Sequence, residues 1–130
     1  MSLTFDFIGI VTRDLAASLA FYRLLGLDIA DGQDSEPHVE VALPNGVRIG
    51  WDPIETIHSF DPEYVFPSGD HRVAFGYQAA DAAEVNAAHA RLVAAGHRSR
   101  VDPWDAPWGQ RYATVLDPDG NAIDIYASLD

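Results

Sequence analysis

One order of secondary structure, βαβββ, is predicted twice along the 130 residues of this chain. In the first half, apolar residues recur at helical spacing between Asp14, which suits a helix N-cap, and Gly26, which suits the position just after a helix. Pro44-Asn45-Gly46 is a hairpin turn signal between the last two expected strands. The strands expected in this half are short β-branched or alternating runs at 5–11, 27–30, 38–43 and 47–51.

The second half repeats this order. Asp81 and Glu84 have the spacing of a capping box at a helix start, and Gly96 ends that helix. The strands expected here are 72–77, 97–101, 111–116 and 121–126, the last two joined by the turn at 117–120. The segment 53–70 between the halves is acidic, is interrupted by Pro residues and has no regular period, so we expect a linker or loop there.

The repeat also shows faintly in the residues themselves, because 44–51 echoes 118–125. A single module of this kind cannot bury both its helix and its sheet face well, and pairing two modules solves that problem. We therefore predict an α+β fold in which two βαβββ modules form a curved mixed sheet. The whole chain, 1–130, is expected to be one domain, with modules at 4–52 and 71–127 and a linker at 53–70.

The charge of the chain restricts its partners. The net charge is −12, and arginine supplies all the positive charge because there is no lysine. Such a surface repels phosphate backbones, so we expect no nucleic-acid partner. It would attract cationic small molecules, although an acidic surface also simply favours solubility. No apolar run is long enough for a membrane span, the first residues lack signal-peptide features, and the absence of Cys excludes disulfides, so we expect a cytoplasmic protein with no membrane partner.

Two groups of residues form a recognisable pattern. The first is Ile8–Leu15, followed by Ser18, Phe21-Tyr22 and Leu25–Leu27. The second is Pro107–Arg111, leading into Asp117–Asn121 and Ile123–Ile125. Together they resemble the vicinal oxygen chelate superfamily, which has the glyoxalase and bleomycin-resistance fold. The resemblance covers nearly the whole chain, and the two groups in this order on a duplicated plan are specific to the fold. They are not specific to a reaction, because one fold serves many functions.

The resemblance implies that the two modules form a cupped cleft. In metal-dependent members, four side chains on the first and last strands of each module hold a divalent metal, and they are usually His, Glu or Gln. Carried over to this sequence, those positions are Phe7, Gly50, Arg72 and Asp124. Phe and Gly have no side-chain donor atom, Arg stays cationic, and one carboxylate does not make a divalent site. We therefore expect no metal and no cofactor there.

His71 is the residue that could change this expectation, because a one-residue slip would place it at the position of Arg72. Strand side chains alternate between faces, so both cannot point into the cleft, and the slip would turn Phe75 away from the helix. We therefore expect His71 at a rim or turn. The remaining histidines, His38, His58, His89 and His97, are expected to be ordinary surface residues.

The Phe7 ring, the Arg72 guanidinium and the Asp124 carboxylate in the implied cleft suit a planar ligand with polar edges. Arg72 and Asp124 could equally pair with each other. Trp104 and Trp108, expected on a loop, offer stacking surfaces, although Trp108 could instead pack on the last hairpin. Trp51 is expected in the core. The predicted ligand-binding residues are Phe7, Arg48, Gly50, Arg72, Trp104, Trp108 and Asp124.

Bleomycin-resistance members of the superfamily are similar to this chain in being acidic and in lacking the metal ligands. They sequester drugs as homodimers. The resemblance thus implies a metal-independent homodimer that sequesters a small aromatic drug or metabolite, cationic ones included, and favours binding over catalysis. The alternative is a metal-dependent lyase, isomerase or extradiol-type dioxygenase that uses His71 and Asp124. A metal-free enzyme with Asp124 or a tyrosine as its acid–base group is a third interpretation.

Overall fold

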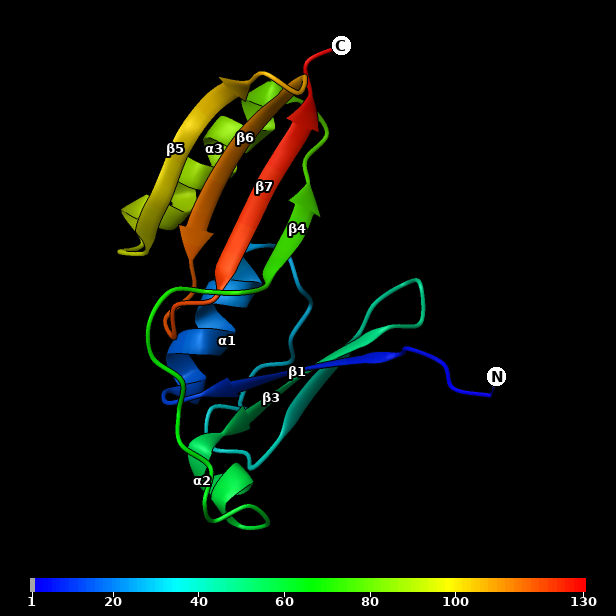
Figure 1. Ribbon diagram of the computed structural model, residues 1–130, viewed down its shortest axis with the longest axis vertical. Helices are drawn as coiled ribbons and strands as arrows, with labels where there is room; N and C mark the ends of the chain where they lie inside the picture. The colour runs from blue at the N-terminus through cyan, green and yellow to red at the C-terminus, as the bar shows by residue number, and fades with distance from the viewer. Residues whose placement is uncertain (1) are drawn as a thin grey trace. The chain divides into compact units, whose positions relative to one another are not determined.

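The computed structural model describes residues 2–130, and the chain divides into two compact units, 1–68 and 69–130 (Figure 1). The first unit has a three-stranded sheet in the order β1-β3-β2, in which β1 is parallel to β3 and β2 is antiparallel to it. Its elements are β1 (Phe7–Thr12), α1 (Leu15–Leu24), β2 (Val39–Ala42), β3 (Arg48–Pro53) and α2 (Ile54–His58).

The core of the first unit lies between α1 and one face of its sheet. Leu19 and Tyr22 on α1 are fully buried, as is Trp51 on β3, and the rings of Tyr22 and Trp51 lie 5.4 Å apart. The prediction that Trp51 belongs to the core is confirmed. Because side chains alternate along a strand, burying Trp51 on this face places its neighbours Gly50 and Asp52 on the opposite face.

The ends of α1 are those expected, but the strand expected after it is not present. The Asp14 carboxylate caps the helix by accepting from the Ala17 N–H at 3.1 Å, and Gly26 follows the helix at φ +98°. Residues 27–30 form no strand, because the Arg23 guanidinium on α1 binds the carbonyl oxygens of Ile29 at 3.1 Å and Ala30 at 2.6 Å. Those carbonyls are therefore held by a side chain rather than by a neighbouring strand.

The first unit is thus βαββ, and its predicted βαβββ order is wrong by that one strand. The expectation of a loop over 53–70 is also wrong in part, because α2 lies within that segment. Pro53 precedes α2 as its N-cap residue, where a missing N–H removes no helical hydrogen bond.

The second unit has the complete predicted order. Its four-stranded sheet runs β4-β7-β6-β5, with β4 parallel to β7 and the other pairs antiparallel. The α+β class is therefore confirmed, with both sheets of mixed type over residues 2–130. Its elements are β4 (Ala74–Gln78), α3 (Ala82–Ala94), β5 (Arg98–Ala106), β6 (Gln110–Leu116) and β7 (Ala122–Ser128).

Helix α3 covers one face of this sheet (Figure 1). It begins where expected, since the Asp81 carboxylate accepts from the Glu84 N–H at 2.9 Å. The Glu84 side chain reaches the Ala80 N–H, one residue before the N-cap, at 3.4 Å. Buried side chains of α3 and of the sheet form the core: Val85, Ala88, Leu92, Ala113, Val115, Ile123 and Ile125.

Two of the differences between observed and expected strand boundaries in the second unit change the position of a predicted site residue. Strand β4 begins at Ala74, so His71 and Arg72 lie before it, both exposed. Strand β5 extends to Ala106, so Trp104 lies on a strand and not on the expected loop. None of the helices in residues 2–130 has the length and apolarity to cross a membrane.

Candidate functional site

A row of aromatic side chains lies on the face of the second sheet opposite α3. Ala113 and Val115 face the helix, so alternation turns Tyr112 and Thr114 to the other face. The strand register places Trp104 opposite Tyr112, and Tyr112 opposite Tyr126. We define the aromatic row as Trp104, Trp108, Tyr112 and Tyr126.

The rings of the aromatic row are in successive contact. Trp104 and Trp108 have ring centroids 5.6 Å apart at 90°, and Trp108 and Tyr112 are 5.5 Å apart at 83°. Tyr112 and Tyr126 are stacked with centroids 6.5 Å apart. These are favourable edge-to-face and offset geometries. The two tryptophans remain 40% and 58% exposed, so the row presents aromatic surface to solvent.

Asp124 is the carboxylate beside the aromatic row. It accepts a hydrogen bond from the Thr114 hydroxyl at 2.7 Å. Burial raises the pKa of Tyr112 to about 12, and hydrogen bonding to the Asp124 carboxylate adds to that rise. Tyr112 therefore stays a protonated donor at neutral pH. The hydroxyls of Thr114 and Tyr112 are neutral, so these two bonds orient the Asp124 carboxylate without neutralising it.

The register shows which residues occupy equivalent places in the two sheets. Gly9 is opposite Gly50 in the first sheet, and Gly76 is opposite Asp124 in the second. Gly9 and Gly76 are each the third residue of their strand, and matching them makes Gly50 the equivalent of Asp124, the pairing expected from the sequence repeat. The residue equivalent to Phe7 is then Ala74, which lies two positions before Gly76 as Phe7 lies two positions before Gly9.

Arg72 was predicted at the place that the register gives to Ala74. It lies two residues before β4, and the register puts Gly76, not Arg72, beside Asp124. The predicted grouping of Phe7 with Arg72 and Asp124 stays a prediction, because Phe7 belongs to the first unit and the others to the second. Within residues 2–130, no three His, Asp or Glu side chains are arranged to hold a metal ion.

Three predicted site residues do lie together on the open face of the first sheet. An ideal Cβ at Gly50 would be 2.6 Å from the Phe7 ring and 3.0 Å from the His38 ring, so these two rings cover Gly50. The Arg48 guanidinium lies 5.1 Å from the centre of the Phe7 ring. Phe7 and His38 thus fill the space over Gly50 that a ligand would need.

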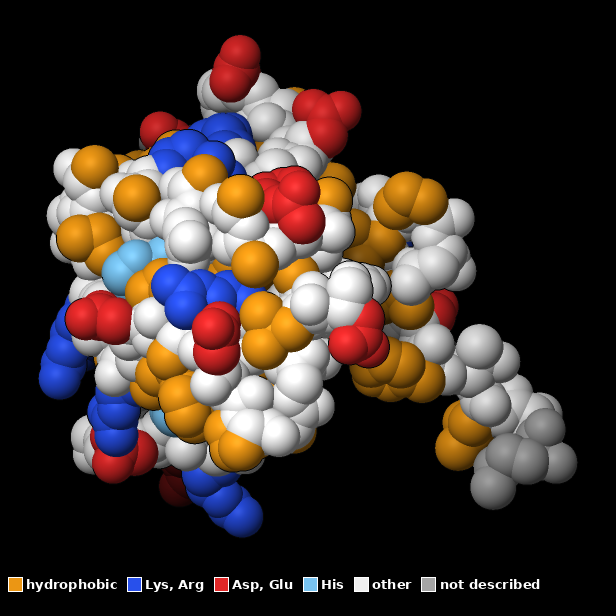
Figure 2. Space-filling view, turned by 90° about the horizontal axis from the view of Figure 1, so that it is seen from above, with side chains coloured by type: hydrophobic (Ala, Val, Ile, Leu, Met, Phe, Trp, Pro, Cys, Tyr) orange, Lys and Arg blue, Asp and Glu red, His pale blue; other side chains and the backbone are white. Residues whose placement is uncertain are grey.

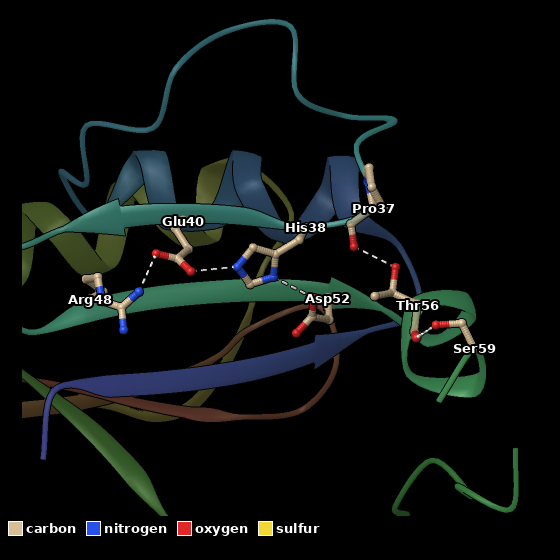
Figure 3. Close-up of polar contacts among 7 residues, drawn as sticks. All are labelled: Pro37, His38, Glu40, Arg48, Asp52, Thr56 and Ser59. Atoms are coloured by element: carbon tan, nitrogen blue, oxygen red, sulfur yellow. Dashed lines mark hydrogen bonds and ion pairs between the residues drawn. The ribbon is translucent and has the colours of Figure 1, made fainter. Parts of the chain in front are cut away.

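The same face carries a chain of ion pairs that sequence reasoning missed (Figure 3). His38 Nδ1 lies 2.6 Å from the Asp52 carboxylate, and its Nε2 lies 2.8 Å from Glu40. Glu40 in turn pairs with Arg48 at 3.0 Å. The hydrogen bonds to Glu40 and Asp52 raise the pKa of His38, and the His38 bond lowers the pKa of Glu40. We call Asp52, His38, Glu40 and Arg48 the charged row.

The charged row could have been found from the hairpin. Glu40 is opposite Gly50 and Val39 is opposite Trp51, so the next pair outward is His38 with Asp52. The turn at 44–46 fixes that register, which makes the pairing readable from the sequence. Both ring nitrogens of His38 are directed at carboxylates, so the charged row favours the imidazolium form of this histidine over the neutral form.

A family model described as "Glyoxalase/Bleomycin resistance protein/Dioxygenase superfamily" matches residues 4–125. A glyoxalase/bleomycin resistance protein/dioxygenase from Nocardioides is 25% identical, with a TM-score of 0.75 over 100% of this chain and 86% of that one. A family enzyme from Burkholderia phytofirmans PsJN is 21% identical, with a TM-score of 0.82 over 98% of this chain and 100% of the other. At that identity the second likeness shows the fold alone.

A glyoxalase-related enzyme from Fulvimarina pelagi shares the fold as well, at 22% identity and a TM-score of 0.80 over 98% of this chain and 89% of that one. No curated protein matches the chain. The family match covers both units and nearly all of the elements described above. The resemblance inferred from the sequence is confirmed: this chain belongs to the glyoxalase/bleomycin resistance protein/dioxygenase superfamily.

Proposed function

We propose that this protein binds a planar aromatic small molecule by stacking on the aromatic row, without a metal ion and without changing the molecule. The observation that carries the proposal is the set of four contacting rings, two of them substantially exposed, on the sheet face that the helix leaves open. Large exposed aromatic groups gathered on one face typically mark a recognition surface.

Asp124 gives the proposed ligand its preferred charge. Its carboxylate lies beside Tyr112, and its hydroxyl donors do not neutralise it. Asp105, the neighbour of Trp104 in the sequence, lies on the α3 side of the sheet and pairs with Arg111 at 3.1 Å. Figure 2 shows acidic side chains interspersed with arginines over the visible face, so the net charge is not gathered there in one patch. A cationic ring or a ring with an N–H donor is therefore favoured by Asp124 itself.

Tryptophan fluorescence tests the proposal directly, because Trp51 is fully buried and the two exposed tryptophans belong to the row. We expect a cationic planar probe such as proflavine to quench the emission more strongly than neutral phenazine or an anionic naphthalene sulfonate. Each of Trp104→Ala and Trp108→Ala should weaken binding about 2- to 12-fold, which corresponds to about 0.5–1.5 kcal/mol per aromatic contact.

Phe60→Ala is the matched control, since Phe60 is also exposed but lies in the first unit, outside the row. It should leave probe binding unchanged. Absence of quenching by every probe in the panel would contradict the proposal. Stoichiometric divalent metal that survives dialysis and is lost in Asp124→Ala would favour the metal-dependent lyase, isomerase or dioxygenase instead. The homodimer and the cytoplasmic location expected from the sequence stay predictions.

A further inference from the structure

We propose that His89, together with Ser99 and Asp102, positions Trp104 in the aromatic row by fixing two bulges in β5. This proposal rests on the proposed function for its consequence in binding, but its structural part can be measured without a ligand. His89 lies on α3, on the face of the sheet away from the row, so it would act on the row only through β5.

The register of β5 against β6 shows the two bulges. Ser99 is opposite Val115, and a regular ladder would then place Trp104 opposite Gln110, five residues further along each strand. Instead the register shifts between Ser99 and Val101 and again between Val101 and Trp104, and Trp104 lies opposite Tyr112. At about 3.3–3.4 Å per residue, a two-residue shift moves Trp104 roughly 7 Å along β6.

That shift decides whether Trp104 belongs to the row. Because two extra residues restore the alternation, Trp104 keeps the same face but gains Tyr112 as its cross-strand neighbour. In the regular register it would lie two positions away, beside Gln110. The position of Trp104 opposite Tyr112 in the row therefore depends on the bulges.

A side-chain cluster spans the bulged segment. The Ser99 hydroxyl donates to Asp102 at 2.6 Å, which connects the last residue of the regular ladder to a residue within the second bulge. His89 Nε2 lies 2.8 Å from the same hydroxyl and 3.5 Å from the Asp102 carboxylate. Because the hydroxyl gives its one hydrogen to Asp102, it accepts from His89, whose Nε2 therefore carries a proton.

His89 connects this cluster to the buried core of the unit. Its side chain is only 12% exposed, and it lies on the stripe of α3 that includes the buried Val85, Ala88 and Leu92. Pro103, within the second bulge, has no N–H for a ladder hydrogen bond, so the sequence disrupts the ladder here. The His89–Ser99–Asp102 cluster then selects one arrangement of the disrupted segment.

The test measures the geometry of the Trp pair and the affinity for proflavine in the same variants. Trp104 and Trp108 at 90° and 5.6 Å should give an excitonic couplet in far-ultraviolet circular dichroism, which Trp104→Phe assigns by removing it. We expect Ser99→Ala and His89→Ala to weaken the couplet, shift the indole N–H resonances of both tryptophans, and reduce affinity several-fold. Ser99→Thr keeps the hydroxyl and should retain the wild-type couplet, indole resonances and affinity.

Val85→Ala is the control for a purely structural effect, because Val85 is fully buried on α3 but belongs to no bond of the cluster. It should lower the unfolding midpoint and leave the couplet and the indole resonances unchanged. Wild-type indole resonances and couplet in both Ser99→Ala and His89→Ala would overturn the proposal. Failure of every aromatic probe to bind the wild-type protein would instead contradict the proposed function, while the couplet and resonances would still decide the role of His89.

Discussion

Replacing Gly50 by alanine tests the claim that Phe7 and His38 fill the open face of the first sheet. The backbone at Gly50 is not in the left-handed region, so the new methyl group meets no backbone strain. It would, however, lie 2.6 Å and 2.8 Å from two atoms of the Phe7 ring and 3.0 Å from the His38 ring. Contacts this short require the Phe7 ring to move.

The expected loss of stability is the difference of two effects. Overpacking of this kind costs about 1–3 kcal/mol. Alanine is otherwise favoured over glycine inside a strand by roughly 0.5–1 kcal/mol, because glycine loses more backbone entropy on folding. We therefore expect Gly50→Ala to lower the free energy of unfolding by about 0.5–2 kcal/mol, with the methyl–ring clash as the dominant cause.

A double-mutant cycle with Phe7→Ala isolates that cause. Urea denaturation of the wild type, the two single variants and the double variant gives the coupling energy between positions 7 and 50. In the Phe7→Ala background the nearest obstruction is gone, so Gly50→Ala should become neutral or slightly stabilising. If Gly50→Ala destabilises the protein equally with and without the Phe7 ring, the ring does not cover Gly50 and the reasoning is refuted.

Four further predictions concern single groups. The raised pKa of His38 means that its contribution to stability is complete below its ordinary value of 6.5 and is lost as the pH rises through the raised value, so urea midpoints of wild type and His38→Gln should converge at alkaline pH. Conversely, the lowered pKa of Glu40 gives stability that is present above pH 4.5 and is lost on acidification. Glu40→Gln should remove this part of the pH dependence of the urea midpoint. Burial raises the pKa values of Tyr77 and Tyr112 to about 12, so an absorbance titration should show their two phenols ionising at higher pH than an exposed tyrosine. Tyr112→Phe should remove one of these two high-pH transitions. Asp81→Ala removes the N-cap of α3 and should cost about 1 kcal/mol in urea denaturation, while Asp81→Asn should retain most of the stability.

The elements that were predicted correctly are those set by local chemistry. Asp14 and Asp81 cap helices as their positions in the sequence indicate, and Trp51 is buried because it alternates with the apolar positions of its strand. The missing strand at 27–30 illustrates the opposite case. Its sequence is apolar enough for a strand, but the Arg23 side chain binds its carbonyls, and such a side-chain contact leaves no periodic signal.

The candidate site divides in the same way. The hairpin register, which places Arg48 and Gly50 on one face, could be predicted from the turn at 44–46. The same register implies the His38–Asp52 pair, which the sequence analysis did not predict. Trp104 was predicted as a ligand-binding residue because its large ring can stack on a ligand. Its neighbour Tyr112 could not be predicted, because two bulges change the register of β5. Pro103 indicates that a disruption exists without giving its length.

The two sheets share a plan but differ in what lies over equivalent positions. In the first, Gly50 is covered by the rings of Phe7 and His38, and the charges around them are paired within the charged row. In the second, Asp124 lies beside an exposed glycine, with its carboxylate oriented by neutral hydroxyls and aromatic surface leading away from it. In the first sheet the charged side chains therefore pair with one another, whereas in the second the Asp124 carboxylate and the aromatic row offer a charge and a stacking surface to another molecule. This difference is why we propose ligand recognition by the second unit, and why a substitution at Asp124 should affect affinity more than one at Gly50.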